Sequence, residues 1–254
     1  MIIFETNNSL INYMKIHLPN FITSCNLFCG CIATVMVFRN HLDFAAYFVF
    51  LAAFFDLLDG MAARKFLSNP AFGKELDSLA DVISFGFVPG AVLFKLLQQS
   101  NMEMYFHSEI FIRIFQFFPF VITIFSALRL AKFNIDTRQT NSFIGLPTPA
   151  TTLFIVSLPL ILMQQPGKFN DLILNPYLIS IVTILFSFLL ISEIPLFALK
   201  FKTKGIKENI FQYVLILAVI ILFPIFLFAT IPIAIIFYIL LSVIQNRTKT
   251  KSLK

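Results

Sequence analysis

Charged residues are scarce in this sequence, and tryptophan is absent. Only 13% of the 254 residues are Asp, Glu, Lys or Arg, whereas soluble domains carry about 25%, and 58% of the residues are hydrophobic. This composition excludes a water-soluble globular protein and predicts an integral membrane protein. The net charge of +6 does not indicate a nucleic acid partner, because most Lys and Arg residues flank apolar runs, where they set membrane topology.

Cysteine and histidine are also rare. Cys25, Cys29 and Cys31 lie in one apolar stretch, and the three histidines are scattered along the chain. Because zinc sites need several Cys or His ligands at fixed spacing, we predict a packing role for the cysteines. Residues 1–18 lack the features of a signal peptide, so we expect the mature chain to begin near Met1 with a short amphipathic segment.

Apolar runs of membrane-spanning length account for most of the sequence. Since about 20 residues cross a bilayer as a helix, they predict an all-α, polytopic membrane bundle of about eight transmembrane helices, with six or seven as alternatives. The last two runs are divided only by an expected turn near Pro224. The runs cover residues 19–38, 42–62, 76–98, 110–131, 148–163, 173–199, 210–224 and 228–245.

Basic residues are distributed unevenly between the two sides of this predicted bundle. An even number of spans with both termini cytoplasmic places 15 of the 19 Lys and Arg residues inside, as membrane topology favours. The same arrangement makes the polar segment 56–81 cytoplasmic. The inside residues are Lys15, Arg64, Lys65, Lys74, Arg129, Lys132, Arg138, Lys200, Lys202, Lys204, Lys207, Arg247, Lys249, Lys251 and Lys254.

Four of the 13 acidic residues lie in or beside apolar helix ends within one short segment. Asp56 and Asp59 are three residues apart, and Asp77 and Asp81 are four apart, so each pair projects from one helix face. A carboxylate at membrane depth costs at least about 2.5–3.5 kcal/mol, so these acids need a cation. We expect them to converge on one point and to hold Mg²⁺ or Mn²⁺, as two ions that also bind a substrate phosphate.

Small and basic residues frame the acids. Gly60 and Ala63 share a helical face with Asp56 and Asp59 and leave room for a ligand, and Arg64 can pair with phosphate oxygens. Gly73 is expected to permit a tight turn before the third span. The alternative to a metal site is a solvent-exposed helix end, where the acids form ion pairs with Arg64, Lys65 and Lys74. That alternative accounts for one or two carboxylates and not for two spaced pairs.

The segment from Asp56 to Asp81 resembles the signature of the CDP-alcohol phosphatidyltransferase family, D-x2-D-G-x2-A-R-x8-G-x3-D-x3-D, at every specified position. The resemblance implies that Asp56, Asp59, Asp77 and Asp81 bind two divalent cations and that Asp81 is also the catalytic base. It further implies that a CDP-linked lipid lies against four residues of the signature, namely Gly60, Ala63, Arg64 and Gly73.

Further segments resemble the phosphatidylserine synthase branch of that family: LPNFITSCNLFCG from Leu18, RLAKFN from Arg129, FIGLPTPA from Phe143 and SEIP from Ser192. By this resemblance Asn20 and Thr23 contact the nucleotide, although they could simply start a helix. Arg129, Lys132 and Asn134 would hold the lipid phosphate or the serine carboxylate, or else act as inside-facing anchors.

The activity implied is transfer of a phosphatidyl group from CDP-diacylglycerol to L-serine with release of CMP. Glycerol 3-phosphate, inositol or inositol phosphate remain alternative acceptors. The alternative from another functional class is a cation-coupled transporter, which would carry acidic residues near the middle of the membrane in two matching halves.

The expected location is a bacterial inner membrane, and a homodimer is expected from the resemblance. The expected segments are an amphipathic segment 1–18, a catalytic bundle 19–205, a helix pair 206–245 and a basic cytoplasmic tail 246–254.

Overall fold

The computed structural model describes the backbone of residues 2–66, 70–136, 143–197, 205 and 209–252. It describes the side chains of residues 17–64, 71–136, 144–197, 205 and 209–246. Within these ranges the fold is all-α apart from one pair of two-residue strands. Helices are the expected solution for so apolar a chain, because they satisfy their own backbone hydrogen bonds in lipid.

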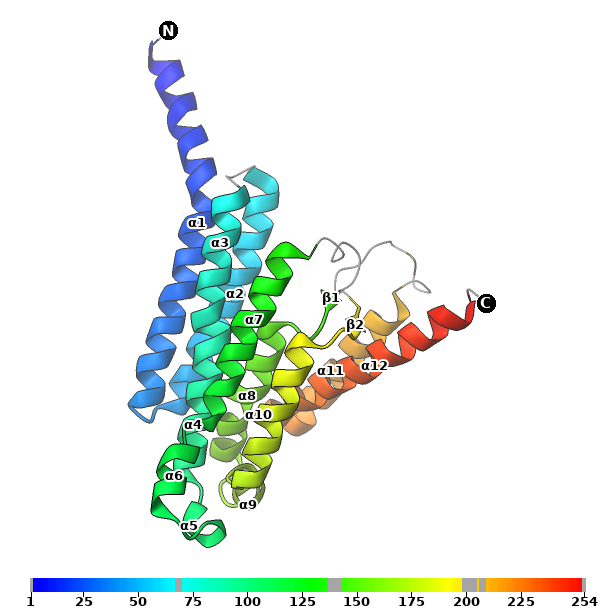
Figure 1. Ribbon diagram of the computed structural model, residues 1–254. Coiled ribbons are helices and arrows are strands. Elements are labelled where there is room, and N and C mark those ends of the chain that lie inside the picture. The colour runs from blue at the N-terminus through cyan, green and yellow to red at the C-terminus, as the bar shows by residue number, and fades with distance from the viewer. Residues whose placement is uncertain (1, 67–69, 137–142, 198–204, 206–208, 253–254) are drawn as a thin grey trace.

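The helices follow one another through short connections and build an elongated bundle (Figure 1). In chain order the elements are α1 (Ile2–Phe38), α2 (Leu42–Phe66), α3 (Pro70–Asp81), the π-helical η1 (Val82–Phe87), α4 (Val88–Gln99), α5 (Met102–Tyr105), α6 (Glu109–Phe115), η2 (Phe118–Phe120), α7 (Val121–Ile135), β1 (Phe143–Ile144), α8 (Thr148–Gln164), α9 (Asn170–Ile173), α10 (Pro176–Ile191), β2 (Pro195–Leu196), α11 (Ile210–Phe226), η3 (Leu227–Ala229) and α12 (Thr230–Ser252).

Among the described residues, five helical segments are long and apolar enough to cross a membrane. Two further apolar helices, α8 and α10, are shorter. The chain is therefore a multi-pass membrane protein. The five long segments are His17–Phe38, Leu42–Arg64, Ala71–Gln99, Glu109–Ile135 and Ile210–Asn246, the last of which contains both α11 and α12.

The predicted boundaries need three corrections. The third span begins at Pro70, so Gly73 lies inside α3 and not in a turn before it. The run expected at 173–199 is divided, because α10 ends at Ile191 before the extended SEIP segment. Pro224 lies within α11, and the chain reverses three residues later, where Leu227 has a φ of 46°.

Helix direction alternates, so that the polar connections gather at one end of the bundle. Figure 1 shows the C-terminal ends of α2, α7, α10 and α12 at the same end as the β1–β2 pair. The N-terminal ends of α3, α8 and α11 also lie there. Of the basic residues predicted to lie inside, Arg138, Lys200, Lys202, Lys204, Lys207 and Lys254 fall outside the described residues.

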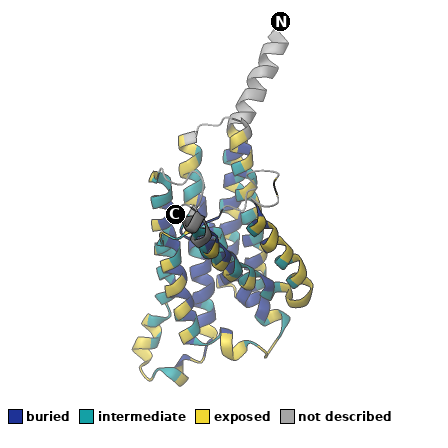
Figure 2. Ribbon diagram, turned by 90° about the vertical axis from the view of Figure 1, so that its right-hand side faces the viewer, coloured by how far each residue is buried: buried dark blue, intermediate teal, exposed yellow. Residues whose placement is uncertain are grey.

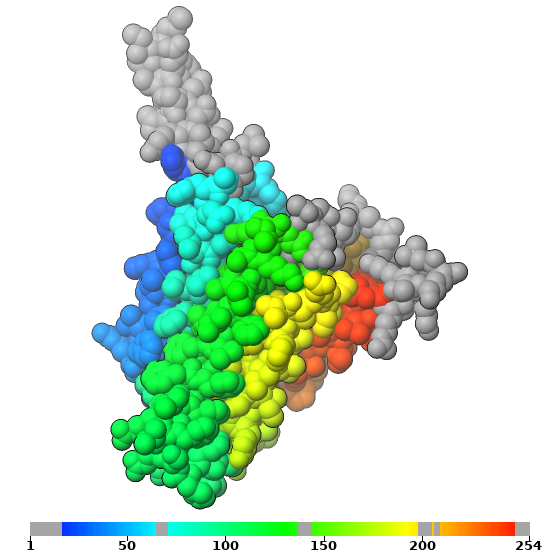
Figure 3. Space-filling model, viewed as in Figure 1, coloured from blue at the N-terminus to red at the C-terminus, as the bar shows by residue number. Residues whose placement is uncertain are grey.

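Helix α4 occupies the centre of the bundle. Nine of its residues from Val88 to Leu97 are buried, as expected for a helix that is apolar on all sides. The outer helices instead place buried side chains inward and large exposed apolar ones outward (Figure 2), where lipid replaces water. Helices α3, α7 and α10 pack side by side on the face seen in Figure 3.

The two strands join distant parts of the chain. Phe143 pairs with Leu196 and Ile144 with Pro195 in antiparallel register. Gly145 follows β1 with a φ of 77°, and a Cβ there would lie 2.6 Å from the Leu190 carbonyl oxygen. The chain can thus turn from β1 into α8 only because this position has no side chain.

We predict that Gly145→Ala destabilises the protein more than Gly167→Ala. Both glycines have a positive φ, which costs roughly 1–2 kcal/mol for an L side chain, but nothing lies within 4 Å of a Cβ at Gly167. Crowding at Gly145 should add about 1–3 kcal/mol. Thermal unfolding in detergent measures the difference, and equal losses of stability in the two variants would contradict the tight turn described here.

Candidate functional site

The site is built where the end of α2 meets the start of α3. Asp56 and Asp59 lie in the last three turns of α2, and Asp77 and Asp81 lie in the second half of α3. The spacings of three and four residues keep each pair on one helix face. The short connection between the helices brings the two faces together at the end of the bundle that carries the polar connections.

Three of the carboxylates form a close cluster. Oxygen atoms of Asp56, Asp59 and Asp77 all lie within 4.8 Å of one another. Asp59 is 5% exposed, and its Oδ2 atom and the Oδ1 atom of Asp77 are buried without a hydrogen-bond partner among the described residues. Such crowding of like charges requires a cation, and an all-oxygen donor set suits a hard divalent ion. The residues therefore fit the expected Mg²⁺ or Mn²⁺.

Asp81 lies one turn further along α3 and is not part of that close group, but it interacts electrostatically with Asp56 and Asp77. Its Oδ1 atom accepts a hydrogen bond of 3.2 Å from the Asn26 side-chain amide. The Asn26 carbonyl in turn accepts one of 3.1 Å from the Ser84 hydroxyl. A side chain at Gly30 would collide with Ser84, so this glycine permits the close approach of α1.

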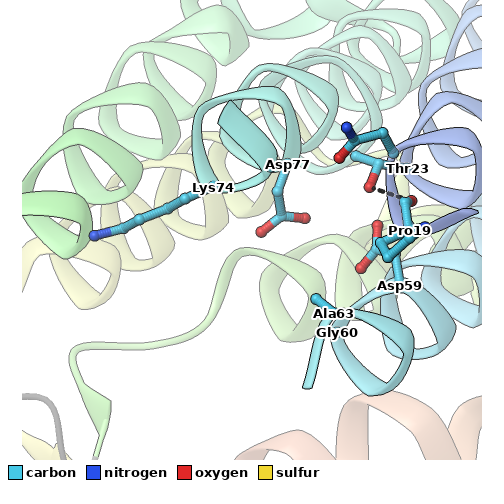
Figure 4. Close-up of a pocket in the computed structure, with 9 residues that line it drawn as sticks. Pro19, Thr23, Asp59, Gly60, Ala63, Lys74 and Asp77 are labelled. Carbon is cyan, nitrogen blue, oxygen red and sulfur yellow. Dashed lines mark hydrogen bonds between the residues drawn. The ribbon is translucent and has the colours of Figure 1, made fainter. Parts of the chain in front are cut away.

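A pocket of about 240 Å³ opens beside the cluster between α1, α2 and α3 (Figure 4). Figure 4 shows Asp59 and Asp77 facing into it, while the Lys74 side chain leads away. Arg64 lies at its margin, with one guanidinium nitrogen 3.9 Å from the position of a Cβ on Gly60. The lining residues are Pro19, Asn20, Thr23, Asp59, Gly60, Ala63, Gly73, Lys74 and Asp77.

The structure explains why small residues line this pocket. Gly60 and Ala63 leave its α2 wall open, and a Cβ on Gly73 would lie 3.4 Å from the Asn20 side-chain oxygen. Asn20 and Thr23 face the same space from α1, one turn apart. Of the six residues expected to contact CDP, five thus line one pocket, and Arg64 borders it.

The three α7 residues expected to act together lie in different surroundings. Arg129 is 8% exposed, interacts electrostatically with Asp81 and Asp56, and directs Nη1 to the Thr148 hydroxyl at 3.4 Å. Its Nε atom is buried without a hydrogen-bond partner among the described residues. Only Arg129 of the three therefore points to the carboxylates.

Lys132 and Asn134 contact neighbouring segments. The Lys132 ammonium pairs with Glu193 at 3.3 Å, beside β2. The Asn134 side-chain amide donates to the Ser78 hydroxyl at 2.9 Å, and the Asn134 backbone carbonyl accepts a hydrogen bond from the Lys74 ammonium. These contacts fasten α7 to β2 on one side and to α3 on the other.

Sequence reasoning missed Asn26 and Thr148 as members or neighbours of the site. The available signal was Asn26 itself, a polar residue inside an apolar run and one turn after Thr23. Thr148 offered no such signal, because its contact with Arg129 depends on how α7 and α8 pack.

The comparison with known families settles the class. The CDP-alcohol phosphatidyltransferase profile matches residues 16–189, which include all four aspartates and the pocket. The chain belongs to this family. Its members are phosphatidyltransferases, so the chain is a transferase of phospholipid biosynthesis with an acidic cluster able to bind metal.

Several relatives of the transferase are named CDP-diacylglycerol–serine O-phosphatidyltransferase. The Bacillus subtilis protein is 32% identical over 178 residues, covering 70% of this chain and 88% of the relative. The Methanocaldococcus jannaschii protein is 34% identical over 180 residues, covering 70% and 73%. A Helicobacter pylori protein is 34% identical over 140 residues, covering 54% and 55%.

We predict opposite effects of Asp59→Asn on stability with and without a divalent ion. Without an ion the substitution relieves carboxylate repulsion and should raise the unfolding temperature. Mg²⁺ or Mn²⁺ should stabilise the unsubstituted protein, by about 2.7 kcal/mol at a concentration 100 times the Kd, and should stabilise the variant far less.

Asp43→Asn is the matched control, because Asp43 lies in the first turn of α2, far along the helix from the cluster. This variant should keep the full ion-dependent rise in unfolding temperature. An undiminished rise in Asp59→Asn would show that the ion binds elsewhere.

Proposed function

We propose that this chain transfers the phosphatidyl group of CDP-diacylglycerol to the hydroxyl of L-serine and releases CMP. The observation that carries the proposal is the carboxylate cluster of Asp56, Asp59 and Asp77 on the wall of a pocket lined by small residues. Membership of the family supports the phosphatidyl transfer, and the names of the relatives support serine. Clustering of the acids at one end of the bundle favours a transferase over a cation-coupled transporter.

In this proposal the α1–α3 pocket holds the CDP portion of the donor. Gly60, Ala63 and Gly73 let the sugar and pyrophosphate approach the helix backbones closely, and Asn20 and Thr23 supply polar contacts from α1. Arg64 at the margin pairs with phosphate oxygens through its fork of donors. The acyl chains remain in the bilayer.

Asp56, Asp59 and Asp77 would hold the divalent ions, with Asp81 completing the site for a second ion. When bound, such ions neutralise the charge of the pyrophosphate. The two buried oxygens of Asp59 and Asp77 that have no hydrogen-bond partner among the described residues are the ones we expect to act as ligands.

Asp81 is the proposed catalytic base. It accepts the proton of the serine hydroxyl while the serine oxygen forms a bond to the phosphorus attached to diacylglycerol. The bond from that phosphorus to the CMP oxygen breaks, and CMP leaves with the electron pair. The Asn26 amide orients the Asp81 carboxylate from α1. Positioning and electrostatics supply the rate, so no covalent enzyme intermediate is required.

Arg129 is the proposed contact for the serine carboxylate or the lipid phosphate. It is a buried cation close to Asp81, with an Nε donor that no described residue accepts. Lys132 and Asn134 support it by fixing α7 against β2 and α3. Glycerol 3-phosphate, inositol and inositol phosphate are the alternative acceptors. A homodimer stays a prediction.

We further propose eight membrane passages in a bacterial inner membrane, with both termini and the site cytoplasmic. The helices α11 and α12 count as two passages, because they pack against each other across the reversal at η3. Single cysteines in the connection 39–41 and in η3 should be labelled from the periplasmic side. A cysteine at Phe72 should be labelled only from the cytoplasmic side, and labelling of all three from one side would contradict eight passages.

The decisive assay for the activity is an acceptor panel with purified protein and labelled CDP-diacylglycerol. Release of CMP should depend on L-serine and on Mg²⁺ or Mn²⁺. Phosphatidylserine should form in equal amount. Dependence on glycerol 3-phosphate or an inositol compound would reassign the acceptor within the family, and no acceptor-dependent release would refute phosphatidyl transfer.

We predict that Asp81→Asn lowers transfer by at least about 10²-fold, the usual effect of losing a general base. Binding of CDP should remain measurable by calorimetry, because Asp81 does not line the pocket. Asp171→Asn, in the exposed α9 at the other end of the bundle, should leave transfer unchanged. Near-normal turnover in folded Asp81→Asn protein would exclude Asp81 as the base.

A further inference from the structure

The chain continues beyond the region that matches the family. The match ends at residue 189, and β2, α11 and α12 follow it. Helices α11 and α12 pack together as a C-terminal hairpin, and α12 also contacts β2 and α8. In Figure 1 this hairpin lies along the side of the bundle, next to the β1–β2 pair. A segment outside the family match thus touches the end of the molecule that carries the site.

Tyr238 makes the most buried polar link between the hairpin and β2. Its hydroxyl donates a hydrogen bond of 2.8 Å to the Phe197 carbonyl, and its ring meets the Phe197 ring edge to face at 4.9 Å. The exposed fractions are 7% for Tyr238 and 6% for Phe197. The Asn246 amide donates to the Pro195 carbonyl nearby. Helix α12 therefore holds the backbone of 195–197 at two points.

The hairpin also packs directly on α8, through α12 and η3. An apolar groove of about 340 Å³ lies between them, lined by side chains that include Leu153 of α8, Leu215 of α11 and Ile235 of α12. Tyr238 lines the same groove. The connection through residues 195–197 is therefore a second link from the hairpin to the start of α8.

Two backbone hydrogen bonds fix the turn that leads into α8. The Gly145 amide donates to the carbonyl of Ile194, the residue before β2, at 3.0 Å, and the Leu146 amide donates to the Leu189 carbonyl of α10 at 2.9 Å. Two residues later α8 begins at Thr148, whose hydroxyl accepts from Arg129. The segment that leads into β2 and the end of α10 thus together hold the turn before the residue that contacts the Arg129 guanidinium.

A second contact links the segment before β2 to α7, the helix that carries Arg129. Glu193, two residues before β2, pairs with Lys132, which lies one turn after Arg129 on α7. The two α7 cations Arg129 and Lys132 therefore both contact residues close to the β1–β2 pair. The donor pocket between α1, α2 and α3 has no lining residue from these segments.

We propose that Tyr238 is a positioning residue for the acceptor half of the site. By holding residues 195–197, it fixes β1 and the start of α8, and through Thr148 it fixes Arg129 against the incoming acceptor. This role rests on the proposed function and takes the serine carboxylate, of the two groups proposed there, as the one that Arg129 contacts. With this role, the C-terminal hairpin, which lies beyond the family match, contributes to acceptor binding.

Tyr238→Phe tests the role, since it removes only the hydroxyl and keeps the ring contact with Phe197. Loss of one buried hydrogen bond should raise the KM for the acceptor by about 3- to 10-fold. The KM for CDP-diacylglycerol should stay within about twofold, because the donor pocket lies on other helices. Equal rises in both constants, or no rise in either, in an active enzyme would overturn the role of Tyr238.

A second measurement is independent of turnover. Hydrogen exchange of the peptide covering 144–152 should be faster in Tyr238→Phe than in the unsubstituted protein, because the Gly145 amide loses its fixed partner beside β2. Ser242→Ala is the matched control, since among the described residues the Ser242 hydroxyl donates to the Tyr238 carbonyl of its own helix. It should change neither exchange nor the acceptor KM.

The two failures are distinguishable. An unsubstituted protein that releases no CMP with any acceptor refutes the proposed function and, with it, the proposed role in acceptor binding. An active enzyme in which Tyr238→Phe leaves both the acceptor KM and the exchange of 144–152 unchanged refutes the role of Tyr238 alone.

Discussion

Repulsion among the carboxylates at one membrane helix end has to be offset by the helices packed around them. Asp56, Asp59 and Asp77 approach within 4.8 Å, and Asp81 lies one turn away, in a chain with few charges to compensate them. Such a cluster is costly in apolar surroundings unless cations and hydrogen-bond donors surround it. The arrangement of α1 and α7 around α2 and α3 supplies part of that environment.

Each flanking helix contributes a different kind of compensation. Helix α1 brings Asn26 to Asp81, which requires the small residue Gly30 where α1 meets Ser84. Helix α7 brings the guanidinium of Arg129 within electrostatic range of the acids. The remaining open side is the pocket, where a phosphate-bearing ligand and its ions can enter. The part of the aspartate charge that the protein does not offset can thus be offset by ions that enter the pocket with the substrate.

The site was predictable to the extent that it is local in sequence. The spacings within the segment 56–81 are helical, so the pairing of the acids with Gly60 and Ala63 on one face follows from periodicity alone. The grouping of Arg129, Lys132 and Asn134 as substrate contacts stays a prediction. At 3.6 residues per turn, Asn134 lies roughly 140° around α7 from Arg129, so periodicity alone does not place the two on one helix face. Asn134 instead contacts Ser78.

Apolar run length and helical spacing are properties of contiguous residues, so the membrane class, the helical architecture and the location of the acidic site could be predicted from the chain alone. The packing of the helices was needed to show that Asp56, Asp59 and Asp77 form the close cluster, that Asn26 contacts Asp81, and that Tyr238 of α12 contacts Phe197 beside β2. These features join residues from distant parts of the chain. Their formation depends on how closely each helix pair packs, which small residues such as Gly30 and Gly145 permit but no local pattern specifies.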